Sequence, residues 1–199
     1  LLESEMIATS ITVREGTTDL LLSMLRANEL DFVICNLTGK PLGIEFTSLP
    51  LYKDSIAVAV RRNHPLVTNE KISWQDLSGY SMILPPEFAT TRFAIEEYLI
   101  YRGVDLAHRY VESVSTLTNI GILQRTDSVA FISHTVANHF EIKGEIAILP
   151  LKLEDIMIEI GLVWQTDRKL TPALETVIQL LKNTPFTDAF SGAESPLFK

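Results

Sequence analysis

Hydroxyl side chains cluster at three places where a short apolar, β-branched stretch gives way to a stretch with helical periodicity. The first turn of a helix exposes unsatisfied N–H groups and the positive end of the helix dipole, so each place could bind an anion or an oxygen atom. Ser and Thr are also the ordinary N-caps of helices, which explains each cluster without a ligand. Both explanations stay open for the three clusters, which are Gly16-Thr17-Thr18, Ala89-Thr90-Thr91 and Ser113-Val114-Ser115-Thr116.

The middle cluster has neighbours that favour a ligand. Pro85-Pro86 stiffens the approach to it, and Arg92 and Phe93 follow the threonines. The guanidinium of Arg92 could pair with a carboxylate through two hydrogen bonds, and the ring of Phe93 could cover an apolar face of the same ligand. The alternatives are that Arg92 is a solvated helix residue and that Phe93 belongs to the core. We include both residues, with Thr90 and Thr91, in a predicted ligand site.

Ser133 and His134 come at the end of an apolar, strand-like stretch at residues 128–133. His134 could face the same crevice as the hydroxyl clusters, or it could lie in a surface turn. A Ser beside a His is weak evidence for a catalytic triad, because such a set can be assembled from any chain of this length. We expect no metal site, because no i, i+4 helical pair and no partner cysteines accompany the other histidines, which are His64, His108 and His139.

Motifs for catalysis and cofactor binding are absent from the sequence. It contains no nucleophile elbow, no glycine-rich phosphate loop and no dinucleotide fingerprint. We therefore expect no enzyme activity, no catalytic residues and no cofactor. The chain has 25 acidic and 17 basic residues and a net charge of −8, so its field repels phosphates. We expect no binding of nucleic acid by these residues.

The single cysteine and the short apolar runs indicate a cytoplasmic protein. Cys35 lies in the apolar run at residues 31–35, where a buried, inert thiol is the simpler expectation, and no disulfide can form within the chain. The apolar runs are shorter than the roughly 20 residues that span a bilayer. The residues after Leu1 lack the order of a signal peptide, in which charges precede an apolar core. We therefore expect no membrane partner.

Short apolar stretches alternate with stretches of helical period, which is the pattern of βα units with parallel strands. Helices are expected near residues 17–28, 91–102 and 115–125, and a fourth is expected to follow Thr171 as N-cap and Pro172 in its first turn. In open α/β sheets ligands bind at the carboxyl ends of the strands, so the hydroxyl clusters are expected to face one crevice. The expected strands are residues 10–14, 31–36, 45–51, 55–61, 81–84, 110–112, 128–133, 145–150 and 157–165.

Four segments, in this order, resemble the regulatory domain of LysR-type transcription regulators. The first combines a helix, a turn at Asn28 and the triplet Glu29-Leu30-Asp31 before a strand. The family usually has Gly at this turn, and Asn tolerates the same left-handed backbone. In the last segment, Ser128 and Ser133 stand where the family usually has Gly and Pro. The other segments are residues 43–66, ending in His64-Pro65-Leu66, residues 72–77, and residues 128–133 followed by 148–151.

The resemblance covers nearly the whole chain and implies an α/β fold of the periplasmic binding protein type 2 kind, with two Rossmann-like lobes joined by crossing strands. Lobe one would comprise residues 1–53 and 163–184, lobe two residues 54–162, and residues 185–199 a C-terminal tail. The resemblance also implies that the first strand of lobe one and a DNA-binding winged helix-turn-helix domain precede Leu1. DNA would then be bound only through that N-terminal domain.

An effector-sensing function follows from the resemblance. A small polar or anionic metabolite would bind between the lobes and shift the DNA-bound states of a homodimer or tetramer. A periplasmic solute-binding protein of the same fold is the alternative, although it would need a secretion signal and more residues. An enzyme that uses the same cleft is a further alternative, but it lacks acid and base residues at plausible spacing. The helix starts and the resemblance together predict an effector site of Thr17, Thr18, Thr90, Thr91, Arg92, Phe93, Ser115, Ser133 and His134.

Overall fold

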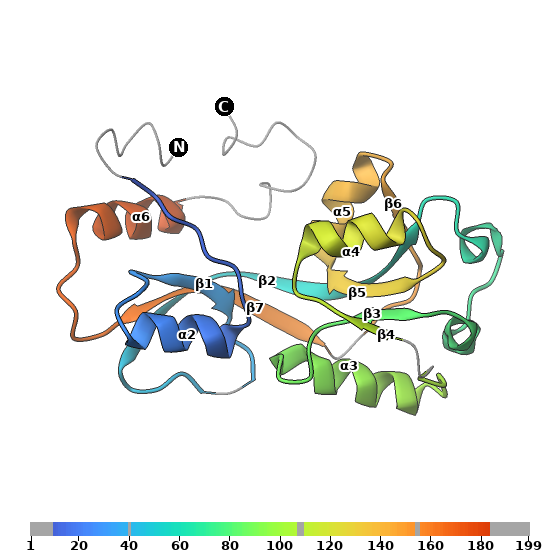
Figure 1. Cartoon of the computed structure of the whole chain (residues 1–199), viewed down its shortest axis with the longest axis horizontal. Coiled ribbons are helices and arrows are strands. Elements are labelled where there is room, and N and C mark those ends of the chain that lie inside the picture. Colours follow the sequence, from blue (N-terminus) through green and yellow to red (C-terminus); the bar gives the residue numbers. More distant parts are fainter. Residues whose placement is uncertain (1–9, 40, 107–109, 154–155, 184–199) are drawn as a thin grey trace. The chain divides into compact units, whose positions relative to one another are not determined.

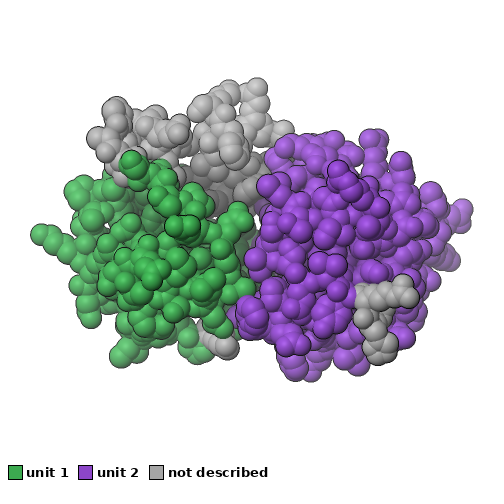
Figure 2. Space-filling model, viewed as in Figure 1, with its two compact units in different colours: residues 1–53, 158–199 green, residues 54–157 purple. Residues whose placement is uncertain are grey.

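The computed structural model of the chain describes residues 10–39, 41–106, 110–153 and 156–183. The chain divides into two compact units, which are shown in different colours in Figure 2. Unit 1 comprises residues 1–53 and 158–199, and unit 2 comprises residues 54–157. The chain passes from one unit to the other within β2 (Phe46–Arg61) and again within β7 (Met157–Gln165). The return to unit 1 comes at residue 158 in this division, and the lobe boundary that the resemblance implies is at residue 163.

Unit 1 is built on the pairing of β1 (Val33–Asn36) with β7, which is antiparallel and sets Val33 opposite Val163. Side chains alternate between the two faces of this sheet. One face packs on α2 (Thr18–Arg26), whose Leu21 and Leu25 contact Val33, Cys35 and Val163. The other face packs on α6 (Pro172–Asn183), whose Leu174 and Ile178 contact Leu162.

The ends of both unit 1 helices agree with the sequence prediction. The hydroxyl of Thr171 accepts a hydrogen bond from the N–H of Leu174 at 3.2 Å, which caps α6 before Pro172, its first residue. At the end of α2, Asn28 has a φ of 59°, the left-handed backbone that Gly or Asn adopts most readily. The predicted cap of α6 and the predicted turn at Asn28 are both confirmed.

The strand predicted at residues 10–14 is wrong, because residues 10–17 have no regular secondary structure. A strand needs a neighbour for its backbone N–H and C=O groups, and no ladder partner for residues 10–14 occurs in the described part of the chain. These residues instead line a groove of about 700 Å³ within unit 1, together with side chains of β1 and α6. The expected tail at 185–199 and His108 lie outside the described residues.

Unit 2 is built on a five-stranded sheet with the order β6-β2-β5-β3-β4. Within unit 2, β2 is antiparallel to both β5 and β6, whereas β3 is parallel to both β4 and β5. The remaining strands are β3 (Met82–Leu84), β4 (Tyr110–Glu112), β5 (Val129–Ser133) and β6 (Ile146–Ile148). The mixed α/β fold is therefore confirmed, with the parallel strands in unit 2.

Helices cover both faces of the unit 2 sheet. α3 connects β3 to its neighbour β4, whereas α4 connects β4 back to β5 on the other side of β3, so the two connections run in opposite directions along the sheet. Because both connections are expected to be right-handed, their helices lie on opposite faces of the sheet. Figure 1 shows α3 on one face and α4 with α5 on the other. Two 3₁₀ turns, η1 (Pro65–Thr68) and η2 (Trp74–Gly79), precede β3. The α-helices are α3 (Thr90–Tyr101), α4 (Thr116–Leu123) and α5 (His134–Ile142).

Two features of the structure differ from what the sequence indicates. The strands predicted at 45–51 and 55–61 form one continuous strand, β2, because the polar residues between them do not interrupt the extended backbone. The sequence also does not predict α5, which is only nine residues long and buries a single side chain, that of Ala137. A helix this short has too little apolar periodicity to be recognised from sequence.

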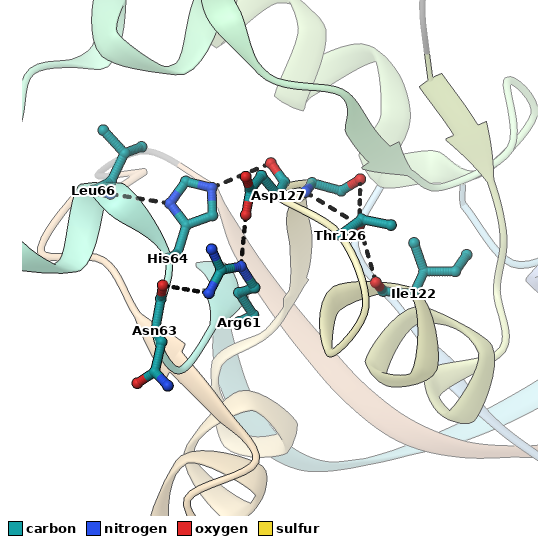
Figure 3. Close-up of polar contacts among 8 residues, drawn as sticks. Arg61, Asn63, His64, Leu66, Ile122, Thr126 and Asp127 are labelled. Carbon is teal, nitrogen blue, oxygen red and sulfur yellow. Dashed lines mark hydrogen bonds and ion pairs between the residues drawn. The ribbon is translucent and has the colours of Figure 1, made fainter.

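A buried histidine ties the end of β2 to the turn before β5 (Figure 3). His64 is fully buried, and its Nδ1 accepts a hydrogen bond from the N–H of Leu66 at 3.1 Å. Because Nδ1 is an acceptor, the proton of the neutral ring is on Nε2, which lies 3.1 Å from the backbone oxygen of Asp127. Arg61 forms an ion pair with Asp127 at 2.5 Å and strengthens the same connection. Burial lowers the pKa of His64.

Candidate functional site

The three parallel strands of unit 2 bring three helix starts to one edge of the sheet. Because β3 is parallel to β4 and β5, the carboxyl ends of all three strands lie at the same edge. α3, α4 and α5 each follow one of these strands and therefore begin at that edge, which we call the carboxyl edge of unit 2. The direction of the connections also reverses at β3, and such switch points are where open α/β sheets bind ligands.

At the start of α4, the hydroxyls serve the helix itself. The Ser115 hydroxyl accepts from the N–H of Thr118 at 3.4 Å, and the Ser113 hydroxyl accepts from the N–H of Ser115 at 3.1 Å. Capping is therefore the role of Ser115 in this structure. In the described part of the chain, the N–H groups of Thr116 and Leu117 have no hydrogen-bond partner. The first turn of α4 thus still presents two donors.

At the start of α5, a carboxylate that the sequence analysis missed joins the cap. The Ser133 hydroxyl accepts from the N–H of Val136 at 3.2 Å and is itself hydrogen-bonded to Oδ2 of Asp54. Oδ1 of Asp54 accepts from the N–H of Thr135 at 3.2 Å, and only 6% of Asp54 is exposed. The sequence signal is faint, because Asp54 is one charged residue just before the apolar half of β2. A carboxylate at this position also interacts favourably with the helix dipole.

His134 is exposed, as in the surface alternative, but it is the first residue of α5 rather than part of a turn and therefore lies at the carboxyl edge. No hydrogen bond joins His134 to Ser133 or Asp54 among the described residues. A triad needs the histidine between the hydroxyl and the carboxylate, whereas here Ser133 contacts Asp54 directly. Ser133, His134 and Asp54 therefore lack the geometry of a catalytic nucleophile with its general base.

The start of α3 differs from the other two because it has no side-chain cap. Its N-cap residue is Ala89, which has no polar side chain, and Thr91 is half-buried in the first turn. Phe93 is 71% exposed, so the alternative in which it belongs to the core is wrong. The capping explanation therefore does not account for the threonines of this cluster, which leaves the ligand explanation standing for Thr91.

Arg92 fits neither of the two roles considered for it from the sequence. It is 3% exposed, so it is not a solvated helix residue. Its Nε is 2.7 Å from Glu96, and its Nη1 is 2.6 Å from the backbone oxygen of Pro85 and 3.0 Å from Glu112. Burial by itself lowers the pKa of this guanidinium, but hydrogen bonds with Glu96, Glu112 and Tyr110 and the charge of Glu96 raise it overall. Arg92 thus joins α3 to the ends of β3 and β4, which sets the shape of the carboxyl edge.

Apolar side chains are also exposed around the same helix starts. Folded units normally cover such side chains when several lie close together, and an exposed group of them often marks a binding surface. Phe88 and Phe93 are at the start of α3, and Val114 and Leu117 are at the start of α4. Their exposed fractions are 64%, 71%, 50% and 77%, respectively. The carboxyl edge therefore offers apolar contact as well as hydrogen-bond donors.

The remaining predicted residues, Thr17 and Thr18, belong to unit 1, while the other seven belong to unit 2. Thr17 is the N-cap residue of α2, but its hydroxyl makes no capping hydrogen bond. Within the described ranges no cluster of three or more His, Cys, Asp or Glu side chains could hold a metal ion. The same ranges contain no helix that is both long and apolar enough to cross a membrane.

Comparison with known proteins identifies relatives along most of the chain. It is 25% identical over 179 residues to the HTH-type transcriptional regulator PcaQ of Agrobacterium fabrum, which is 90% of this chain and 58% of that protein. It is 30% identical over 171 residues to the uncharacterized HTH-type transcriptional regulator YbhD of Escherichia coli K12, which is 86% of this chain and 52% of that protein. The chain thus spans about half the length of these relatives.

Solved structures share the fold. The effector binding domain of QuiR in complex with shikimate matches with a TM-score of 0.67 and 18% identity, covering 90% of this chain and 84% of that one. The CcmR regulatory domain of Synechocystis PCC6803 in complex with 2-PG matches with a TM-score of 0.70 and 18% identity, covering 90% and 85%. The sequence model of the LysR substrate binding domain matches residues 7–185. The chain therefore belongs to the family of LysR substrate-binding domains.

Proposed function

We propose that this chain senses a small polar or anionic metabolite for a LysR-type transcription regulator and that the metabolite binds at the carboxyl edge of unit 2. The observation that carries this proposal is the convergence of three helix starts at one sheet edge, with α3 uncapped and two N–H groups of α4 unpartnered in the described part of the chain. Helix starts bind anions through such N–H groups. The exposed rings of Phe88 and Phe93 would contact the apolar part of the ligand.

Known ligands of structural neighbours are compatible with this chemistry. Shikimate and 2-PG are named as the ligands of the QuiR and CcmR domains. For the present chain we infer only the class, an organic acid or phosphate with polar substituents. Thr90, Thr91, Phe93 and His134 remain proposed contact residues, and Ser115 and Ser133 would act by ordering the helix starts. Thr17 and Thr18, at the start of α2 in unit 1, stay predictions from the sequence.

Such domains form part of longer regulators, and we propose that the longer protein couples ligand binding to DNA binding. Ligand binding would shift the balance between DNA-bound states, and DNA would be contacted by a winged helix-turn-helix domain N-terminal to the sensor. We propose a cytoplasmic homodimer or tetramer that catalyses no reaction. The curated relatives are transcriptional regulators, which favours this function over a periplasmic solute-binding protein.

Thermal-shift screening of organic acids and phosphates tests the proposed site. Wild-type protein is expected to be stabilised by a subset of the compounds, since a ligand that binds only the folded state raises the melting temperature. Thr91→Val, which keeps the side-chain volume and removes the hydroxyl, is expected to lose most of that shift. Thr176→Val, a change on α6 in unit 1, serves as the matched control and should keep it. Equal shifts in all three proteins would show that the ligand binds elsewhere.

A further inference from the structure

Asn119 is a buried polar residue with an unused acceptor at the carboxyl edge. It lies in the second turn of α4, and only 6% of it is exposed. Its Oδ1 is fully buried and has no hydrogen-bond partner within the described residues. Buried amide oxygens are nearly always paired, because losing water without gaining a partner costs free energy. An unpaired one therefore needs an explanation.

The direction of the side chain follows from helix geometry. Asn119 and Leu123 are four residues apart, so they share the face of α4 that packs on the core of unit 2. Helical side chains lean toward the N-terminus of their helix and cover the preceding turn. The amide of Asn119 is therefore directed along the buried side of α4 toward its first turn, where the N–H groups of Thr116 and Leu117 are unpartnered among the described residues.

Packing alone does not explain an asparagine here. Its buried neighbours on α4 are Ile120 and Leu123, which join an apolar cluster with Ala137 of α5 and Ala130 of β5. A leucine of similar volume would fill this position without leaving a polar group unpaired. An asparagine with an unpaired oxygen at this site costs free energy, and a ligand that supplies a hydrogen-bond donor would remove that cost.

We propose that Asn119 determines effector specificity by accepting a hydrogen bond from a hydroxyl group of the effector. The acidic group of the same molecule would be bound by the N–H groups at the start of α4, less than one turn away from Asn119. The effector would then be a hydroxylated organic acid, with at least one hydroxyl close to its acidic group. This inference rests on the proposed function of the carboxyl edge and narrows its ligand class.

Pairs of acids that differ only in their hydroxyls test this inference. The probes are shikimate against cyclohex-1-ene-1-carboxylate, malate against succinate, and lactate against propionate, measured by titration calorimetry. Wild-type protein is expected to bind at least one hydroxylated member about tenfold or more tightly than its partner, because a site that hydrogen-bonds a hydroxyl discriminates against ligands that lack it. Asn119→Leu should lose this preference and retain the affinity for the acid without hydroxyls.

Two further measurements separate the loss of the Asn119 amide from a loss of folding. The melting temperature of ligand-free Asn119→Leu should equal or exceed that of the wild type, since the variant leaves no buried polar group unpaired. Asn119→Ala provides a second variant without the amide and should lose the same preference even if its core packing is weakened. Equal binding of both members of every pair by the wild type, or an unchanged preference in both variants, would overturn the inference while leaving the proposed site intact. Failure of all six acids to bind would also overturn it, and the wider screen with Thr91→Val would then decide the proposed function separately.

Discussion

The hydroxyl of Ser133 is hydrogen-bonded to the carboxylate of Asp54, a residue 79 positions earlier in the chain. The antiparallel pairing of β2 with β5 brings the two residues together, since Ile56 lies opposite Ser133. Asp54 also accepts hydrogen bonds from the N–H groups of Ser55 and Thr135, at 2.8 and 3.2 Å. β2 thus supplies the carboxylate that completes the cap of α5, the helix that follows β5.

Removing this cap is expected to destabilise the domain. Ser133→Ala deprives the N–H of Val136 of its acceptor and Asp54 of a donor, which should lower the free energy of unfolding by about 2 kcal/mol. Urea denaturation followed by tryptophan fluorescence measures the change, and Trp74 reports on unit 2. Thr118→Ala, on an exposed position of α4, is the control and should change stability by less than about 0.5 kcal/mol. Equal losses in both variants would contradict a special role for the Ser133 cap.

Replacing Arg92 by lysine is expected to destabilise the domain. The ammonium of lysine cannot reproduce the fork that contacts Glu96, Glu112 and the backbone oxygen of Pro85, so Arg92→Lys is expected to lower the free energy of unfolding by about 2 kcal/mol. The same variant should weaken binding of any hit from the metabolite screen, because the α3 start loses its anchor. Arg62→Lys, at an exposed turn residue directly after β2, is the matched control. Full stability of Arg92→Lys would show that the buried fork is dispensable.

The buried His64 predicts a dependence of stability on pH. Its pKa in the unfolded chain is near the ordinary 6.5, and burial lowers it in the folded state. As the pH falls, His64 therefore becomes protonated at a higher pH in the unfolded chain than in the folded protein. The stabilisation from neutral His64 is complete above pH 6.5 and is lost as the pH falls below that value. The difference in unfolding free energy between the wild type and His64→Gln should narrow from pH 7.5 to pH 5.

The control for this titration is Thr118→Ala, which changes an exposed position of α4 and removes no titratable group. Its difference from the wild type should stay constant over the same range. A difference between the wild type and His64→Gln that widens as the pH falls would show that protonated His64 is accommodated in the folded state. That outcome would contradict the hydrogen-bond pattern in which Nδ1 accepts from Leu66.

Cys35 should be chemically inert in the folded protein. Burial in unit 1 raises the pKa of its thiol to about 11, and only the thiolate reacts with disulfide reagents. Native protein at pH 8 is expected to show no modification over an hour, whereas protein in concentrated urea should react fully. The variant Glu70→Cys, on an exposed loop, should react quickly without urea. Rapid reaction of native Cys35 would show that unit 1 opens readily.

Local patterns in the sequence predicted several elements correctly. α6 was predictable because Thr171 caps it, Pro172 occupies its first turn and apolar residues repeat at helical spacing. The turn at Asn28 was predictable because few residues other than Gly adopt a left-handed backbone. α5 was not, since its nine residues bury only Ala137 and carry no strong periodicity. Its N-cap depends on a carboxylate from a distant strand.

The sequence by itself determined the alternation of strands and helices, the family resemblance and the hydroxyls at the helix starts, because these depend on neighbouring residues. Only the tertiary structure decided which of those hydroxyls cap a helix, that Arg92 is buried between two carboxylates, and that Asn119 has an unpaired oxygen. Each of these depends on strand pairing or packing between residues far apart in the chain. Burial and hydrogen-bond partners are properties of the folded arrangement, and no local pattern encodes them.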